Sequence, residues 1–265
     1  MTLDKTDVPP EQIRPLLLQL RLKHWADVLG PDLDQLVPRD RDLVYRLVGQ
    51  WATHELIRRK NTLISARIKA AKFKKIQTVD GFDFDYNRST KLIQKNYLEL
   101  LHSIEPDCLP NAVFAGTAGL GKTRLARSLG YAACQSGLSV LFVTAAEIVN
   151  NLATAQKAFC LEAELRKYRR PQVLIVDELG YVSMAPQESN LFFQVISARH
   201  DQGLGTIVTT NLPFGKFNQI FANDAIAHVI VDRITGDAEV FYLEGDSYRD
   251  REKKLKKTAK AGKKK

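Results

Sequence analysis

The sequence has only three cysteines, Cys108, Cys134 and Cys160, and no two of them form a CxxC pair. An odd and dispersed set of this kind argues against a disulfide framework and offers no zinc-ligand spacing. The chain also lacks any apolar run near the roughly 18 residues that a membrane-spanning helix needs. Its first residues, MTLDKTDVPPEQ, lack the basic-then-apolar order of a signal peptide. We therefore expect a cytoplasmic protein with no membrane partner.

Acidic residues are missing from one stretch of the chain and scarce in another. Residues 56–75 contain eight Lys or Arg and no acid, and residues 249–265 contain ten Lys or Arg and two acids. The net charge of the whole chain is +9, so the remaining residues are net acidic. Concentrated cationic segments commonly bind a polyanion, and nucleic acid fits best here. A solvated helix face and a solubilising tail remain open alternatives. The candidate DNA-binding residues are Arg58, Arg59, Lys60, Arg67, Lys69, Lys72, Lys74 and Lys75.

The organisation along the chain follows from its periodicity. Apolar residues near helical spacing predict helices over residues 11–29 and from Pro38 through the basic block. Residues 1–77 are therefore predicted to form a small all-helical DNA-binding domain. Residues 78–90, with a turn at Asp80 and Gly81, are interpreted as a linker. Residues 91–248 are predicted to form the second domain, and residues 249–265 a basic, disordered tail.

The second domain alternates apolar strands with helical segments. Strands are predicted at NAVFA (111–115), SVLFVT (139–144), PQVLIVDE (171–178) and GTIVTTN (205–211). Helices are predicted over residues 91–104 and 187–201, and Thr144 with Glu147 forms a capping box at the start of another. This alternation is typical of an α/β fold with a central parallel sheet flanked by helices.

One glycine-rich loop carries the clearest chemistry. Residues 116–123, GTAGLGKT, fit the phosphate-loop pattern G-x-x-x-x-G-K-[ST], with a predicted strand before them and a helix after them. Backbone N–H groups of such a loop cradle phosphate oxygens, its lysine reaches the β- and γ-phosphates, and its threonine ligates Mg²⁺. The predicted cofactors are ATP and Mg²⁺. The predicted nucleotide-binding residues are Gly116, Thr117, Ala118, Gly119, Leu120, Gly121, Lys122 and Thr123.

Polar residues at the ends of later strands complete the predicted site. Asp177 ends a buried strand and is predicted to hold Mg²⁺ with Thr123, while Glu178 is placed to polarise an attacking water. Asn211 ends the next strand and can orient that water, although it can equally be a strand-terminating residue before Pro213. Arg233 is a candidate arginine finger, which would stabilise charge in the transition state. A surface ion-pair role is the alternative for Arg233.

Taken together, GTAGLGKT, VLIVDELGY, IVTTNLPF, VDRI and EGDSYRDR resemble the motifs of the IstB/DnaC-like clade of AAA+ ATPases. The basic KAAKFKK followed by GFDFDY is similar to the IstB group in particular, and the resemblance covers roughly residues 11–252. Thr117 and Ala118 depart from the family's common GPPGTGKT, where two prolines stand.

The resemblance implies more than the residues alone. It implies a bacterial insertion-sequence helper that binds ATP, self-associates into rings or spirals on duplex DNA with little sequence preference, and bends the DNA. It also implies a partner transposase of the integrase-like, IstA type, which performs strand transfer, while ATP hydrolysis regulates the assembly. Asn211 takes the sensor role, Arg233 the trans-acting finger role, and Arg249 the role of a second γ-phosphate sensor.

Other readings of the same residues remain open. A replicative helicase loader of the DnaC type uses a closely related ATPase domain, and a non-hydrolysing protein that only senses nucleotide would need no Glu178. The five histidines are scattered, and the sequence has no nuclease-like carboxylate cluster. Nucleotide hydrolysis is therefore the only chemistry that the residues predict, and DNA strand transfer is not expected of this chain.

Overall fold

A computed structural model describes residues 8–248 of the 265-residue chain. Its internal contacts divide the chain into two units, residues 1–65 and 66–265. Helix α3 belongs to both, since it runs from Pro38 to Ala70 across the boundary. None of the helices in the described part is long and apolar enough to cross a membrane.

The first unit is helical, as the periodicity predicts. It contains α1 (Pro10–Gln19), α2 (Lys23–Leu33) and most of α3. The predicted helix over residues 11–29 is interrupted between α1 and α2, where Arg21 takes a left-handed backbone with φ of 62°. A small apolar core joins the three helices, and its buried members are Ile13, Leu17, Leu20, Ala26 and Ala52.

The second unit is built on a five-stranded sheet in the order β2-β3-β4-β1-β5, in which every neighbouring pair is parallel. The strands are β1 (Ala112–Gly116), β2 (Val140–Thr144), β3 (Val173–Asp177), β4 (Gly205–Thr210) and β5 (Glu239–Leu243). The first four are the predicted strands, with ends shifted by one or two residues, whereas β5 is an additional strand at the sheet edge.

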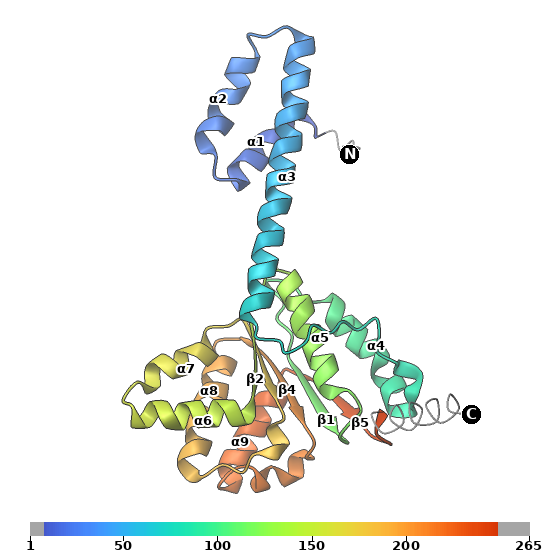
Figure 1. Cartoon of the computed structure of the whole chain (residues 1–265), viewed down its shortest axis with the longest axis vertical. Helices are drawn as coiled ribbons and strands as arrows, with labels where there is room; N and C mark the ends of the chain where they lie inside the picture. The colour runs from blue at the N-terminus through green and yellow to red at the C-terminus, as the bar shows by residue number, and fades with distance from the viewer. Residues whose placement is uncertain (1–7, 249–265) are drawn as a thin grey trace, which may run out of the picture. The chain divides into compact units, whose positions relative to one another are not determined.

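Helices cover both faces of the sheet (Figure 1), as parallel strands require. One face packs against α4 (Arg88–His102) and α5 (Lys122–Gln135). The other face packs against α6 (Ala145–Lys157), α8 (Pro186–Asp201) and α9 (Asp224–Thr235), with α7 (Leu161–Arg169) against α6 and α8. Short 3₁₀ turns lie at η1 (Phe84–Tyr86), η2 (Leu179–Tyr181) and η3 (Phe214–Gln219).

Successive strand residues alternate between the two faces. In β1, Phe114 packs into the core under α5, while Val113 packs into the core on the opposite face. The predicted α/β architecture with a helical N-terminal region is therefore confirmed. The predicted capping box is also present, since the Thr144 hydroxyl accepts the Glu147 N–H and the Glu147 carboxylate accepts the Thr144 N–H.

Residues 78–90, interpreted from the sequence as a linker, pack within the second unit. The turn forms at Asp80 and Gly81 as predicted. Phe84 is buried against Tyr97 of α4, with ring centroids 5.8 Å apart. The aromatic alternation in this segment therefore contributes to the core.

Candidate functional site: a phosphate loop at the carboxyl edge of the sheet

The phosphate loop leaves the carboxyl end of β1 and enters α5. Three of its glycines have positive φ, namely Gly116 (127°), Gly119 (85°) and Gly121 (91°). A Cβ on Gly116 would lie 2.0 Å from the carbonyl oxygen of Leu243, so the strand-to-loop turn accepts no larger residue. The Thr117 N–H donates to that same carbonyl at 2.9 Å and ties the loop to β5. The local sequence thus fixes a backbone curve of the kind that binds phosphate.

Lys122 is the first residue of α5 and is buried. Its Nζ donates to the carbonyl oxygens of Gly116 and Thr117, at 2.7 Å each. The ammonium group therefore lies over the loop itself, at the position where the phosphate groups of a nucleotide would be held.

The carboxylate of Asp177 lies at the centre of a hydrogen-bond network. Thr123 Oγ1 donates to Asp177 Oδ1 at 2.8 Å, and Thr209 Oγ1 of β4 donates to the same oxygen at 2.6 Å. The Thr209 hydroxyl also accepts the Glu178 N–H at 3.0 Å. The structure therefore brings Thr123 and Asp177 together, and it adds Thr209, which the sequence analysis did not single out. A register argument could have found Thr209, because β4 lies beside β3 in the sheet and both strands end at the same edge.

A hydroxyl and a carboxylate oxygen at this spacing suit Mg²⁺, which prefers oxygen ligands at about 2.0–2.1 Å. Asp177 is almost fully buried, and its Oδ1 accepts hydrogen bonds from the two threonine hydroxyls. The residues present therefore fit the predicted ion.

Glu178 follows β3 and has a left-handed backbone, with φ of 62° and ψ of 37°. This conformation is uncommon for a residue with a side chain and tends to occur at functional sites. Its side chain is exposed and lines the same cavity as Lys122 and Asp177. Asn211 lines that cavity too, and its Oδ1 is buried with no hydrogen-bond partner among residues 8–248. An unpaired buried amide oxygen of this kind calls for a water or ligand partner.

The cavity has a volume of about 530 Å³ and lies wholly within the second unit. Beyond the loop, its walls include four aromatic side chains that the sequence alone did not assign to the site, those of Phe82, Tyr86, Tyr181 and Tyr248. The rings of Tyr86 and Tyr248 meet edge to face, with centroids 4.9 Å apart. The signal for two of them was the alternating aromatic pattern of GFDFDY, which was interpreted as linker sequence.

Arg233 lies outside this cavity. It sits in the last turn of α9 and pairs with Asp201 at the end of α8, with Nη1 2.8 Å from Oδ1. The residues around it include Asn111, Leu204 and Ala238, which precede β1, β4 and β5. Arg233 is therefore at the amino ends of the strands, whereas the phosphate loop is at their carboxyl ends.

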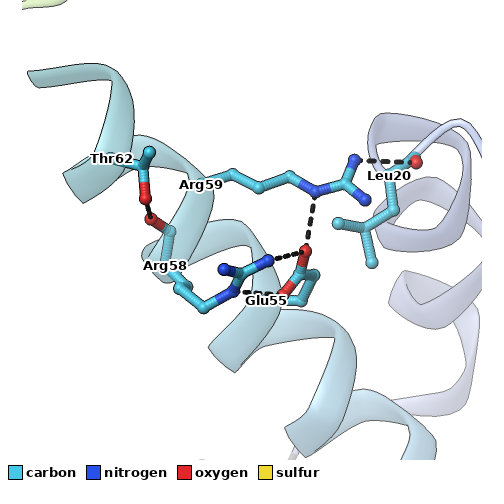
Figure 2. Close-up of polar contacts among 5 residues, drawn as sticks. All are labelled: Leu20, Glu55, Arg58, Arg59 and Thr62. Atoms are coloured by element: carbon cyan, nitrogen blue, oxygen red, sulfur yellow. Dashed lines mark hydrogen bonds and ion pairs between the residues drawn. The ribbon is translucent and has the colours of Figure 1, made fainter. Parts of the chain in front are cut away.

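The eight candidate DNA-binding residues differ in burial and in hydrogen-bond partners. Glu55, just before the basic block, accepts hydrogen bonds from both Arg58 and Arg59, and Arg59 also donates to the carbonyl oxygen of Leu20 at 3.0 Å (Figure 2). These two guanidinium groups hold the pKa of Glu55 down to about 2, so its carboxylate stays ionised. Arg59 is thus partly a structural contact between α3 and the end of α1.

The remaining candidates lie in different surroundings. Lys60 and Lys69 are exposed on α3, and Lys72 and Lys74 are exposed beyond its end. Arg67 is half-buried, and its Nε has no partner among the described residues. Lys75 lines the nucleotide-sized cavity. Arg249 and the predicted tail lie outside the described residues.

Comparison with known proteins gives consistent results. A model of the "IstB-like ATP binding protein" family matches residues 16–256. The chain is 33% identical over 239 residues to a Bacillus thuringiensis subsp. berliner protein named "Insertion sequence IS232 putative ATP-binding protein", a match covering 90% of this chain and 94% of that protein. A Geobacillus stearothermophilus protein with the same description, from insertion sequence IS5376, is 36% identical over 201 residues, covering 76% of this chain and 79% of that protein.

Solved structures resemble part of the chain. The crystal structure of DnaI has a TM-score of 0.55 at 20% identity, covering 64% of this chain and 89% of that chain. The crystal structure of the DnaC helicase loader has a TM-score of 0.52 at 20% identity, covering 62% of this chain and 97% of that chain. At this level of identity the likeness concerns the fold.

Proposed function

This chain belongs to the IstB-like ATP binding protein family, and on that premise we propose that it is an ATP-hydrolysing helper protein of a bacterial insertion sequence. Copies of the chain assemble on duplex DNA in the cytoplasm, bend the DNA, and recruit and activate a partner transposase. ATP hydrolysis regulates the assembly. Strand transfer belongs to the transposase.

One observation supports the proposal above the others, namely the convergence of two threonine hydroxyls on Asp177 beside the phosphate loop. Thr123, Asp177 and Thr209 come from three different elements and meet within 2.6–2.8 Å. Glu178 and Lys122 line the same cavity. This combination provides a phosphate cradle, a cation site and a candidate base in one place, which is the set that nucleotide hydrolysis needs.

The chain's own groups divide the work of hydrolysis. The loop N–H groups and Lys122 bind the triphosphate, and they are held in place before it arrives by the turn at Gly116. Thr123 and Asp177 would hold Mg²⁺, which when bound neutralises charge on the β- and γ-phosphate oxygens. Glu178 accepts a proton from the attacking water, and Asn211 orients that water through its unpaired amide oxygen.

Arg233 completes the site of a neighbouring copy. It lies at the amino ends of the strands, whereas its own phosphate loop lies at their carboxyl ends. A five-residue strand spans roughly 16 Å. An arginine at that distance serves a nucleotide held by another subunit. Nucleotide binding and self-association are thereby coupled.

DNA binding rests on the charge of the basic block. Contacts of Lys and Arg are mostly to phosphate, so binding is largely independent of sequence and falls steeply with salt. Bending a short duplex costs on the order of 1–6 kcal/mol, which many subunits together can offset. A helicase-loader role is the rival, and co-purification of a replicative helicase in place of a transposase would favour it.

Phosphate release with and without duplex DNA tests the proposal. The purified chain should hydrolyse ATP, and Glu178→Gln should bind ATP with similar affinity while its turnover falls at least a hundredfold, since a general base contributes about 10²–10⁴-fold. A Glu178→Gln variant that hydrolyses ATP at the normal rate would remove Glu178 from this role. A wild-type chain that binds ATP without releasing phosphate would favour a nucleotide sensor.

A further inference from the structure

The guanidinium of Arg233 lies over the ring of Phe193, with Cζ 5.9 Å from the ring centroid, and makes its hydrogen bonds through one amino group. Its Nη1 donates to Asp201 Oδ1 at 2.8 Å and lies 3.2 Å from His200 Nδ1. Among residues 8–248, Nη2 has no hydrogen-bond partner, and Nε is buried without one. One amino group is therefore fixed while the other remains able to bind an external anion.

Arg199, which precedes His200 and Asp201 in the chain, ties the end of α8 to neighbouring elements. Arg199 is fully buried, and its Nη1 donates to the carbonyl oxygens of Tyr168 and Pro171 at 2.8 Å each. The other donors of Arg199 reach Thr206 Oγ1 and the carbonyl oxygens of Gln172 and Gly205. The last turn of α8 is thus tied to α7 and to the starts of β3 and β4. His200 and Asp201 follow directly on this fixed turn.

The environment of Asp201 keeps it charged and in place. The hydrogen bond from Arg233 lowers the pKa of Asp201, and His200 adds to the effect, so the carboxylate is ionised at neutral pH. The side chain of Asp201 is 61% exposed and that of Arg233 is 25% exposed. Exposed ion pairs are weak, so this one can orient Arg233 without holding it back from a phosphate of higher charge.

We propose that Asp201 is a positioning residue for the arginine finger, holding Arg233 through Nη1 so that Nη2 faces the γ-phosphate bound by the neighbouring copy. This inference rests on the proposed function, because it assumes that Arg233 acts in trans. Asp201 itself contacts no nucleotide. Its contribution is made by the subunit that donates the finger, and it affects turnover more than binding.

Mixed assemblies separate the finger-donating subunit from the site-donating one. A Glu178→Gln chain, here the finger donor, supplies Arg233 to its neighbour but cannot hydrolyse ATP in its own site. An Arg233→Ala chain, here the site donor, keeps Glu178 and can hydrolyse ATP only if a neighbour supplies the finger. Each should be nearly inactive alone, and mixing them should restore ATP hydrolysis. Adding Asp201→Ala to the finger donor should then lower kcat on the order of tenfold with KM unchanged. Adding it to the site donor should change nothing, and Asp201→Asn in the finger donor should recover part of the rate because the amide can still accept a hydrogen bond.

Glu162→Ala provides a matched control. Glu162 pairs with Arg169, whose side chain is 24% exposed, and the pair has nearly the same exposure as Asp201 with Arg233 but lies on α7. This variant in the finger donor should leave kcat unchanged.

Three results would overturn the inference. They are an unchanged or raised kcat with Asp201→Ala in the finger donor, an equal loss when the change is in the site donor, and a loss explained by a lower melting temperature that Asp201→Asn shares. Failure of the unmodified mixture to regain activity is a different result, since it would contradict the trans finger itself and with it the proposed function.

Discussion

At the scale of single residues, two threonine hydroxyl groups hold one buried carboxylate in position. Asp177 is almost fully buried, and its Oδ1 accepts two hydroxyl hydrogen bonds. Thr209 also fixes the backbone at Glu178 by accepting its N–H. A single side chain on β4 thus contacts both Asp177, which ends β3, and Glu178, which follows it.

Thr209→Val should therefore lower both the stability of the chain and its ATP turnover. The substitution keeps the shape but removes a hydrogen bond to a buried charge, which is worth about 1.5–3 kcal/mol. We expect the free energy of unfolding to fall by that amount and ATP turnover to fall about tenfold. Thr210→Val is the control, because its equally buried hydroxyl bonds only the backbone of Leu212. Equal turnover in the two variants would show that Thr209 has no role in orienting Asp177.

Cys134 gives a test of packing around α5. It is fully buried, and burial raises the pKa of its thiol to about 12, whereas Cys108 and Cys160 are exposed. Because the thiolate is the reactive form, a thiol reagent at pH 8 should titrate two cysteines in the native protein and the third only in denaturant. The unfolded thiol ionises from about pH 9 while the folded one does not, so this group's stabilising contribution is full below pH 9 and is lost as the pH rises toward 12. Rapid reaction of three thiols would mean that α5 opens readily.

At the scale of elements, the sequence predicted those parts whose signal is local. Strands β1 to β4 are apolar runs buried on both faces, and glycines mark the loop after β1. Strand β5 escaped prediction because it lies at the sheet edge, where Glu239 and Tyr242 are exposed and break the apolar run. The packing of Phe84 against α4 was also missed, because only the fold brings those distant residues together. The assigned roles of the site residues stay predictions.

In the basic part of α3, the positive charge of two arginines is partly offset by a neighbouring glutamate. Glu55 binds both Arg58 and Arg59, so these cations are partly neutralised before any DNA phosphate arrives (Figure 2). Glu55→Gln should free them and raise duplex affinity several-fold at low salt. The slope of log K against log salt should steepen by up to about 0.9 for each added phosphate contact.

Fluorescence anisotropy with a short duplex over a salt series measures both quantities. Glu99→Gln changes the net charge equally, and Glu99 lies on α4, where it pairs with Lys95 at 3.8 Å. An equal gain in affinity from both variants would point to net charge alone. Unchanged affinity with Glu55→Gln would favour the solvated-face interpretation of the basic block.

At the scale of the whole molecule, the proposed function divides one hydrolytic site between two copies of the chain. The phosphate loop lies at the carboxyl ends of the strands and Arg233 at their amino ends. Under that proposal a complete site needs two copies, and the nucleotide between them becomes part of the interface. A ligand that binds the assembled state preferentially shifts the equilibrium toward it.

Assembly should consequently follow nucleotide binding. Lys122→Ala should lose tight ATP binding, because Lys122 lies over the loop, and should sediment as a monomer with or without duplex DNA. Glu178→Gln should do the opposite and remain assembled on DNA in ATP, since it binds without turning over. Sedimentation velocity in low-salt buffer with Mg²⁺ distinguishes these states, and Arg233→Ala should bind ATP yet assemble weakly. The wild-type chain could instead stay monomeric in that buffer with a slowly hydrolysed analogue and duplex DNA. That result would contradict the hypothesis that nucleotide bridges two copies, and it would leave Arg233 as an ion-pair partner of Asp201 within one chain.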